Sequence, residues 1–184
     1  SRLGDYVISP QELERDLQYL KEQGYETILP QQLVDWCQSG APLPEKPVML
    51  TFDVGYLSNY TYVLPLLQKY GAKATFAPVG IHTQNFTDTP DPNINYAHMT
   101  WDDLKEMSRS PLVEVANHSY DMHHQTGRHG TKKRPGESEE EYISALKSDL
   151  EQMQHACQQN LGKAPTTFVY SFGQISKEAP DNLK

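Results

Sequence analysis

The sequence predicts an α/β fold with a parallel sheet or barrel. Helical and strand patterns alternate along its 184 residues, which is typical of βαβ units. The clearest strand spans 47–53, an uncharged run that stops at Asp53. A short apolar run bounded by residues that break regular structure indicates a buried strand. Catalytic groups in α/β proteins usually lie at the carboxyl ends of strands, so Asp53 is a candidate site residue, although Asp also commonly caps a turn.

The elements before this strand are predicted from their end signals. Residues 9–23 begin with Ser9 and Glu12, the pair of a capping box, and carry one apolar face formed by Leu13, Leu17 and Leu20. Residues 25–29 form a short predicted strand. A second helix over 30–40 opens on a proline and closes on a glycine. Its expected inward side chains are Leu33, Val34 and Cys37.

The middle of the chain continues the alternation. Residues 59–70 predict a helix in which Pro65 either produces a kink or marks the real start. Its expected inward side chains are Tyr62, Leu66 and Tyr70. A strand over 73–79 follows. The polar residues 80–99 are expected to form a long loop, which in a compact domain is more often functional than idle. A capping box then starts a short helix at Thr100.

The last third predicts two more strands around a long helix. Residues 112–116 form the first strand, residues 119–136 are irregular, and residues 138–159 form the helix. Its expected core face consists of Tyr142, Leu146, Leu150, Met153 and Cys157. Residues 166–170 form the last strand. Five strands fall short of an eight-stranded barrel of roughly 250 residues, and nothing marks a second domain within 1–184.

Composition excludes some classes of function. The formal net charge of −8 argues against nucleic-acid binding, which needs a basic surface, and against an anionic membrane surface. No stretch approaches the roughly 20 apolar residues of a membrane span, and no signal peptide is visible. Both cysteines, Cys37 and Cys157, are expected to be buried thiols, because each falls on the apolar side of a predicted helix.

Histidines gather after the strand over 112–116. His118 follows that strand directly, and His123, His124 and His129 lie in the next eleven residues. If the strands are parallel, His118 and Asp53 open onto the same edge of the sheet. Neutral imidazoles from a strand end, with a carboxylate nearby, suit a metal site, whereas a lone histidine is more often structural. The pattern therefore favours metal-assisted hydrolysis, in which a carboxylate takes a proton from water.

Three segments resemble motifs of the polysaccharide deacetylases (NodB-homology domain, carbohydrate esterase family 4). The first motif, Thr-Phe-Asp-Asp-Gly-Tyr/Pro, is similar to Thr51-Phe52-Asp53-Val54-Gly55-Tyr56. The second, a pair of histidines, is similar to Asn117-His118-Ser119 with His123. The third is similar to Phe168-Val169-Tyr170-Ser171-Phe172-Gly173, with serine where the family has proline. The five-residue spacing of the histidines is similar to the branch that deacetylates poly-N-acetylglucosamine.

The resemblance covers essentially the whole chain and implies a deformed (β/α) barrel, incomplete at its C-terminal end. It implies that Asp53 is the general base and that His118 and His123 bind a divalent metal, zinc first, with cobalt or nickel as alternatives. It also implies that Tyr170 and the backbone N–H near Phe172 contact the substrate or its oxyanion. The implied substrate is an acetylated sugar polymer, and the implied location is extracellular or in the cell envelope.

The chain departs from the family at position 54, where Val54 replaces the aspartate that is the third metal ligand. Valine cannot bind a metal, so affinity should fall by more than the roughly 10–100-fold that follows loss of a residue that only supports a ligand. Asp121, or Asp53 itself, is a substitute to consider. A late Leu-x-His motif with the general acid is also missing from this sequence, for which His124 or His129 are substitutes to consider.

These departures leave three functions open. The first is a metal-dependent deacetylase of an N-acetylated cell-surface polysaccharide. The second is a catalytically inactive module that binds glycan or a protein partner, and the third is a metal-binding domain with other chemistry. An incomplete barrel also exposes a sheet edge, which a partner chain or a missing segment is expected to cover.

Overall fold

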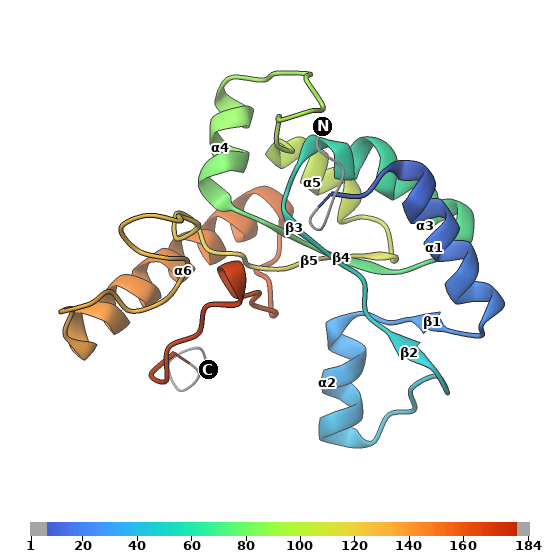
Figure 1. The fold of residues 1–184 in the computed structure, drawn as a ribbon, viewed down its shortest axis with the longest axis horizontal. Helices are drawn as coiled ribbons and strands as arrows, with labels where there is room; N and C mark the ends of the chain where they lie inside the picture. The colour runs from blue at the N-terminus through green and yellow to red at the C-terminus, as the bar shows by residue number, and fades with distance from the viewer. Residues whose placement is uncertain (1–6, 180–184) are drawn as a thin grey trace.

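The computed structural model describes residues 7–179 and has the α/β architecture that the sequence predicts (Figure 1). The helices are α1 (Pro10–Glu22), α2 (Pro30–Ser39), the π-helical turn η1 (Asn59–Val63), α3 (Leu64–Tyr70), α4 (Gly80–Asp88), α5 (Trp101–Met107), α6 (Glu139–Leu161) and the 3₁₀ turn η2 (Ser171–Gly173). The strands are β1 (Glu26–Thr27), β2 (Pro47–Val48), β3 (Thr51–Val54), β4 (Ala74–Pro78) and β5 (Val113–Val115).

A parallel sheet in the order β3-β4-β5 forms the centre of the structure. A single parallel bridge between Asn117 and Phe168 extends it toward the third motif. Strands β1 and β2 pair separately, also in parallel, and with α2 they project from one side of the sheet in Figure 1. The sheet is not closed within residues 7–179. Because β3 and β5 run in the same direction, their carboxyl ends lie at the same edge.

The main core lies between the sheet and the helices that cover it. Strand β4 is buried along its whole length, and Phe76 is completely inaccessible. Helix α5 contributes Trp101, Leu104 and Met107 to the same cluster. Helix α6 reaches it through Met153 and Cys157, which are also fully buried. Each fully buried large apolar side chain contributes roughly 1.5–3 kcal/mol, so this cluster, which also includes buried residues of α1 and α3, holds these helices against the sheet.

The predicted helix ends are confirmed. Capping boxes occur at Ser9, Thr100 and Ser138, each with the side chain and backbone bonds of the motif. Gly40 and Gly162 adopt the left-handed conformation that closes α2 and α6. These local signals depend on backbone groups that any helix end must satisfy, so they can be identified without the tertiary structure.

The predicted loop over 80–99 is wrong in its first half, which forms helix α4. This helix has a weak apolar face, because its buried residues are Gly80 and Thr83, so hydrophobic periodicity does not reveal it. Polar contacts to α5 hold it instead. The backbone N–H of Trp101 donates to Thr87 Oγ1 at 2.9 Å, and the indole N–H of Trp101 donates to Gln84 at 3.0 Å.

Several predicted strands are shorter than expected. Within the predicted strand over 25–29, only the two residues of β1 form a strand. The predicted strand over 47–53 is divided into β2 and β3, which pair with different partners. Strand β3 is not buried, since its side chains alternate between exposed and half-buried. The strand over 166–170 is reduced to the bridge at Phe168. Within the described residues these segments have a partner on one side only, so pairing ends early.

Two inward faces predicted from periodicity are also wrong. Cys37 is exposed rather than buried, and Val34 is 40% exposed, because no residue of α2 is buried by the rest of the structure. Tyr62 is 39% exposed. It lies in η1, whose wider π-helical turn shifts the phase of the helix before α3 begins. Pro65 lies in the first turn of α3 and so marks its real start, one of the two outcomes expected.

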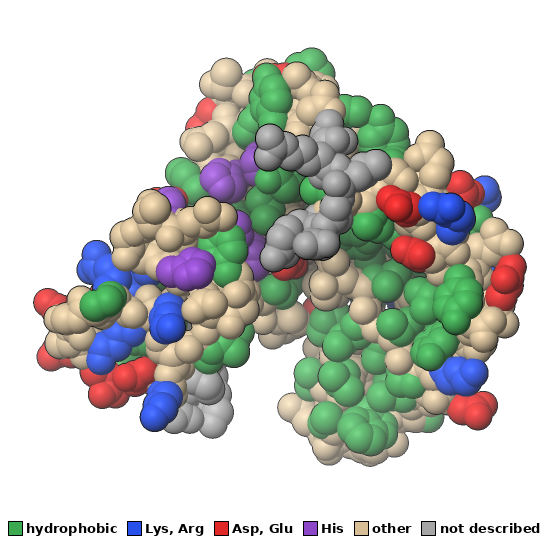
Figure 2. Space-filling model, in the orientation of Figure 1, with side chains coloured by type: hydrophobic (Ala, Val, Ile, Leu, Met, Phe, Trp, Pro, Cys, Tyr) green, Lys and Arg blue, Asp and Glu red, His purple; other side chains and the backbone are tan. Residues whose placement is uncertain are grey.

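The surface agrees with the composition (Figure 2). Acidic and basic side chains are scattered over it, with apolar side chains showing on the α2 side. Among residues 7–179, no helix combines the length and the apolarity that a bilayer crossing requires. Cys37 and Cys157 are both free thiols, and burial raises the pKa of Cys157 to about 12.

Gly55 directly follows β3, and two features of its position require glycine. Its φ is +85°, and a Cβ atom at this position would lie 2.7 Å from Cβ and 3.0 Å from Cα of Pro78. Gly71, which closes α3, has a φ of +64° and no atom within 4 Å of such a Cβ. The two glycines therefore share the left-handed conformation and differ in crowding.

We expect Gly55→Ala to destabilise the protein more than Gly71→Ala. The left-handed conformation alone costs an L-residue roughly 1–2 kcal/mol, which applies to both variants. Only Gly55→Ala adds overlap with the backbone of the adjacent strand. Chemical denaturation of the two variants measures the difference in their free energies of unfolding. Equal losses would contradict the prediction, because they would mean that the overlap with Pro78 is relieved without a loss of stability.

Candidate functional site

Three chain segments bring the motif residues to one edge of the sheet. Asp53 lies near the carboxyl end of strand β3, His118 follows β5, and Phe172 follows the bridge at Phe168. Figure 2 shows histidine side chains gathered on this face, near α4 and the chain that follows β5. The parallel sheet therefore brings together residues that are more than 100 positions apart in the sequence.

His118 is held in one orientation and one tautomer. It is fully buried, and its Nδ1 lies 2.8 Å from the carbonyl oxygen of Val169. Because a carbonyl can only accept, Nδ1 carries the proton and Nε2 keeps its lone pair. Burial lowers the pKa of His118, while the negative charge of Asp53 and the bond to Val169 act in the opposite direction. Asp53 is thus within electrostatic range of a neutral imidazole.

His123 lies against His118 on one side and Phe172 on the other. The ring centroids are 5.0 Å apart for the two histidines and 4.3 Å apart for His123 and Phe172. Burial first, and then repulsion from His118 and His82, lower the pKa of His123 to about 4. Both imidazoles are therefore neutral at pH 7, which is the form that binds metals.

Strained backbone surrounds this pair. The non-glycine residues with positive φ in the described chain are Val54 (70°), Ser119 (74°) and Phe172 (55°), one in each of the three motif segments. Such residues typically cost of order 1–3 kcal/mol each and cluster at functional sites. Val54 is the most unusual, because a β-branched side chain rarely adopts this conformation whereas Asp and Asn do so more readily. The backbone at position 54 therefore suits the carboxylate that the family has there.

The substitutes considered for the missing ligand do not complete a metal site. Asp121 and His124 pair with each other at 3.3 Å, and both are about half exposed. Among residues 7–179, no three His, Cys, Asp or Glu side chains converge well enough to hold a metal ion. His118 and His123 fit a divalent transition metal in the kind of ligand they offer. In the described residues these two imidazoles are not joined by a third such side chain, and position 54, where the resemblance implies a carboxylate, is Val54.

The other two predicted residues differ in their surroundings: Tyr170 packs against a second buried cluster that includes Tyr142 and Leu146 of α6, whereas Phe172 is exposed. Tyr170 packs edge-on against Phe168 with centroids 4.9 Å apart, and burial raises the pKa of its hydroxyl. Phe172 is 37% exposed, and His129 lies beside it at a centroid distance of 5.2 Å. Phe172 therefore offers an exposed aromatic surface next to His123.

Two histidines at this edge are not identified by sequence reasoning. His82 and His98 have ring centroids 4.6 Å apart, and Tyr56 stacks on His98 at 4.7 Å. Burial, and then repulsion from His82, lower the pKa of His98 to about 4. Both ring nitrogens of His98 are buried without a hydrogen-bond partner in the described structure. The only signal in the sequence is that both lie in the polar stretch predicted as a functional loop.

Backbone pairing brings His98 to the first motif. The N–H of Leu57 donates to Ala97, and the N–H of Met99 donates to the carbonyl of Gly55, at 2.8 and 2.9 Å. Tyr56 and His98 form an antiparallel bridge between these bonds. The second half of the predicted loop is therefore part of the site edge.

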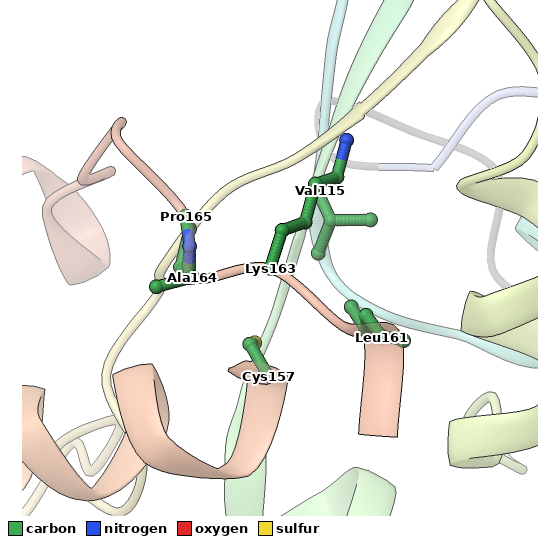
Figure 3. A pocket seen from close by; sticks show the side chains of 6 residues that line it. All are labelled: Val115, Cys157, Leu161, Lys163, Ala164 and Pro165. Atoms are coloured by element: carbon green, nitrogen blue, oxygen red, sulfur yellow. The ribbon is translucent and has the colours of Figure 1, made fainter. Parts of the chain in front are cut away.

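Two surface hollows lie away from this cluster. A hollow of about 490 Å³ lies on α6, lined by Glu139, Glu140, Ile143 and Ser144. A second, of about 10 Å³, lies where α6 ends beside β5 (Figure 3) and is lined by Val115, Cys157, Leu161, Lys163, Ala164 and Pro165. The first is open and offers no imidazole, and the second holds a single water at most. We therefore place the candidate site by its chemistry.

The chain is similar to known deacetylases in sequence and structure. A family model described as polysaccharide deacetylase matches residues 40–184. A poly-β-1,6-N-acetyl-D-glucosamine N-deacetylase of Escherichia coli K12 is 31% identical over 94% of this chain, but the chain spans only 28% of that relative. An enzyme of the same name from Staphylococcus aureus is 24% identical over 95% of the chain and 56% of the relative.

Solved structures agree with this relationship. A de-N-acetylase from Aggregatibacter actinomycetemcomitans has a TM-score of 0.83 at 30% identity, covering 100% of this chain and 76% of that one. The BpsB deacetylase domain from Bordetella bronchiseptica has a TM-score of 0.80 at 28% identity, covering 99% and 76%. The predicted deacetylase-type fold, unclosed within the described residues, is thus confirmed. The chain belongs to the polysaccharide deacetylase family.

Proposed function

We propose that this chain removes acetyl groups from an N-acetylated polysaccharide of the poly-β-1,6-N-acetylglucosamine type. The observation that carries the proposal is the meeting of Asp53, His118 and His123 at one sheet edge, with both imidazoles neutral. The names of the relatives from E. coli and S. aureus supply the substrate class. An extracellular or cell-envelope location, and a segment or partner chain over the open sheet edge, belong to the same proposal.

His118 and His123 would hold the divalent metal, with zinc as the first candidate. Nε2 of His118 is free to bind because Nδ1 is engaged by Val169. When bound, the ion would polarise the acetyl carbonyl and make a bound water more acidic. With Val54 in place of a carboxylate, the protein ligands carry no negative charge, so we expect weak binding.

The other site residues would act on the water or the substrate and would not bind the metal. Asp53 is exposed at the strand end, where its carboxylate can take the proton of the attacking water. A backbone N–H near Phe172 would donate to the oxygen that becomes negative. Tyr56 and Phe172 are 41% and 37% exposed and lie beside His98 and His123, so their rings can stack on sugar rings that flank the reacting one.

A second candidate function is glycan binding without turnover. Val54 favours it, because loss of a ligand weakens the metal while leaving the aromatic surfaces intact. The two candidates differ in bound metal and in released acetate.

Elemental analysis after dialysis against zinc, cobalt or nickel, followed by an acetate assay on a β-1,6-linked N-acetylglucosamine oligomer, tests the proposal. We expect weak, chelator-sensitive metal binding and slow acetate release. A chain that binds the oligomer with neither metal nor acetate release is the glycan-binding module instead.

Restoring the carboxylate should strengthen the site. We expect Val54→Asp to raise metal affinity by more than about 10-fold and to raise the rate of acetate release, because a negative ligand joins two neutral ones. Val54→Asn is the matched control, since Asn also suits the left-handed backbone but brings no charge. Equal metal affinity in the two variants would contradict a ligand role for position 54.

Removing the proposed base should abolish turnover without abolishing metal binding. We expect Asp53→Asn to lower the rate of acetate release about 10²–10⁴-fold, the usual contribution of a general base. The measurement is best made in the Val54→Asp background, where turnover is higher. Full activity of the Asn variant would remove Asp53 from the mechanism.

A further inference from the structure

The loop between His118 and His123 is held by an unusual set of bonds. Four successive backbone N–H groups, those of residues 119–122, each donate to a side-chain oxygen. Asn117 accepts from residue 119 at 2.8 Å, and Ser119 Oγ accepts from residue 122 at 3.1 Å. The two central N–H groups, of residues 120 and 121, share one acceptor, the carboxylate of Asp149.

Asp149 comes from α6, about 30 positions further along the chain. Its Oδ1 accepts from the N–H of Tyr120 at 2.8 Å, and its Oδ2 accepts from the N–H of Asp121 at 2.7 Å. The residue is only 9% exposed. Burial raises the pKa of its carboxyl, while the bonds from Asp121 and Tyr120 lower it. Both carboxylate oxygens of a buried acid are thus directed at one loop.

A buried carboxylate is costly unless it is well bonded, and an apolar residue on this face of α6 would avoid the cost. Its neighbours on the helix are apolar, since Leu146, Leu150 and Met153 are all buried. The two backbone bonds instead fix the loop that separates the imidazoles. The other side of the loop pairs with the start of α4, where the N–H groups of Gly80 and Ile81 donate to residues 119 and 120.

We propose that Asp149 is a positioning residue that sets the position of His123 relative to His118. Four residues, 119–122, lie between the two histidines, and the loop begins at Ser119 in the left-handed conformation. No regular helix or strand spans this loop, so its path depends on side-chain acceptors. This inference deepens the proposed function, because it concerns how the proposed metal ligands are held.

The test uses Asp149→Asn, which keeps size and one acceptor oxygen. Its NH₂ group would face a backbone N–H, so one of the two loop bonds is lost. Cys157→Ser is the control, because it buries a hydroxyl in an apolar cluster about two helical turns away on α6 and lowers stability without touching the loop. If Asp149→Asn does not fold, Asp149→Glu keeps the charge and displaces it by one methylene.

Two quantities are measured in each variant. The first is the nuclear Overhauser effect between the ring protons of His118 and His123 without metal, and the second is cobalt(II) affinity by visible absorption. We expect the Overhauser effect to weaken and cobalt affinity to fall about 10–100-fold in Asp149→Asn, with neither changing in Cys157→Ser.

Unchanged values in Asp149→Asn, or equal changes in Cys157→Ser, overturn the inference. If even Val54→Asp binds no cobalt while Asp149→Asn still weakens the Overhauser effect, Asp149 keeps its positioning role and the metal part of the proposed function fails.

Discussion

The bond between His118 Nδ1 and the carbonyl of Val169, at 2.8 Å, is the interaction on which the candidate site depends. It joins the chain after β5 to the third motif across 51 positions. The adjacent bridge between Asn117 and Phe168 carries the same connection through the backbone. The side-chain contact fixes the direction of the imidazole and selects its tautomer. The backbone bonds of Asn117 to Thr167 and Val169 hold the second and third motifs side by side.

The site is also where the backbone is least relaxed. Val54, Ser119 and Phe172 each adopt a left-handed conformation, and the surrounding bonds must offset that cost. At Ser119 they come from Asn117 and from the start of α4. At Val54 the β-branched side chain makes the strain larger than an aspartate would. A valine at this position thus retains a backbone geometry that suits a carboxylate while offering no ligand.

The histidines at this edge are uncharged near pH 7, because their pKa values are lowered. Burial keeps His118, His123, His82 and His98 uncharged near pH 7, and repulsion between several of them would oppose protonation further. Such a cluster can bind a metal through lone pairs but does not attract it through charge. Asp53 supplies negative charge near His118, and a residue that serves as base is less available as a ligand. For this reason we expect the residue at position 54 to decide between the two proposed functions.

The amino-acid sequence is sufficient to predict the α/β class, the helix starts at Ser9, Thr100 and Ser138, and the candidate residues Asp53, His118 and His123, because these signals are local in the chain. The roles of Asp53, His118 and His123, and the interpretation of residues 1–184 as a single domain, stay predictions. The three-dimensional structure was needed to show that residues 80–88 form helix α4, that Cys37 is exposed, and that His82 and His98 lie at the site edge. Periodicity does not reveal α4 or the place of His98, because polar contacts and a backbone bridge position them, and it predicts a buried Cys37 because it cannot show that α2 buries none of its residues. Asp149 shows the same limit, since a buried carboxylate on a helix is recognisable only once the loop it binds has been located in space.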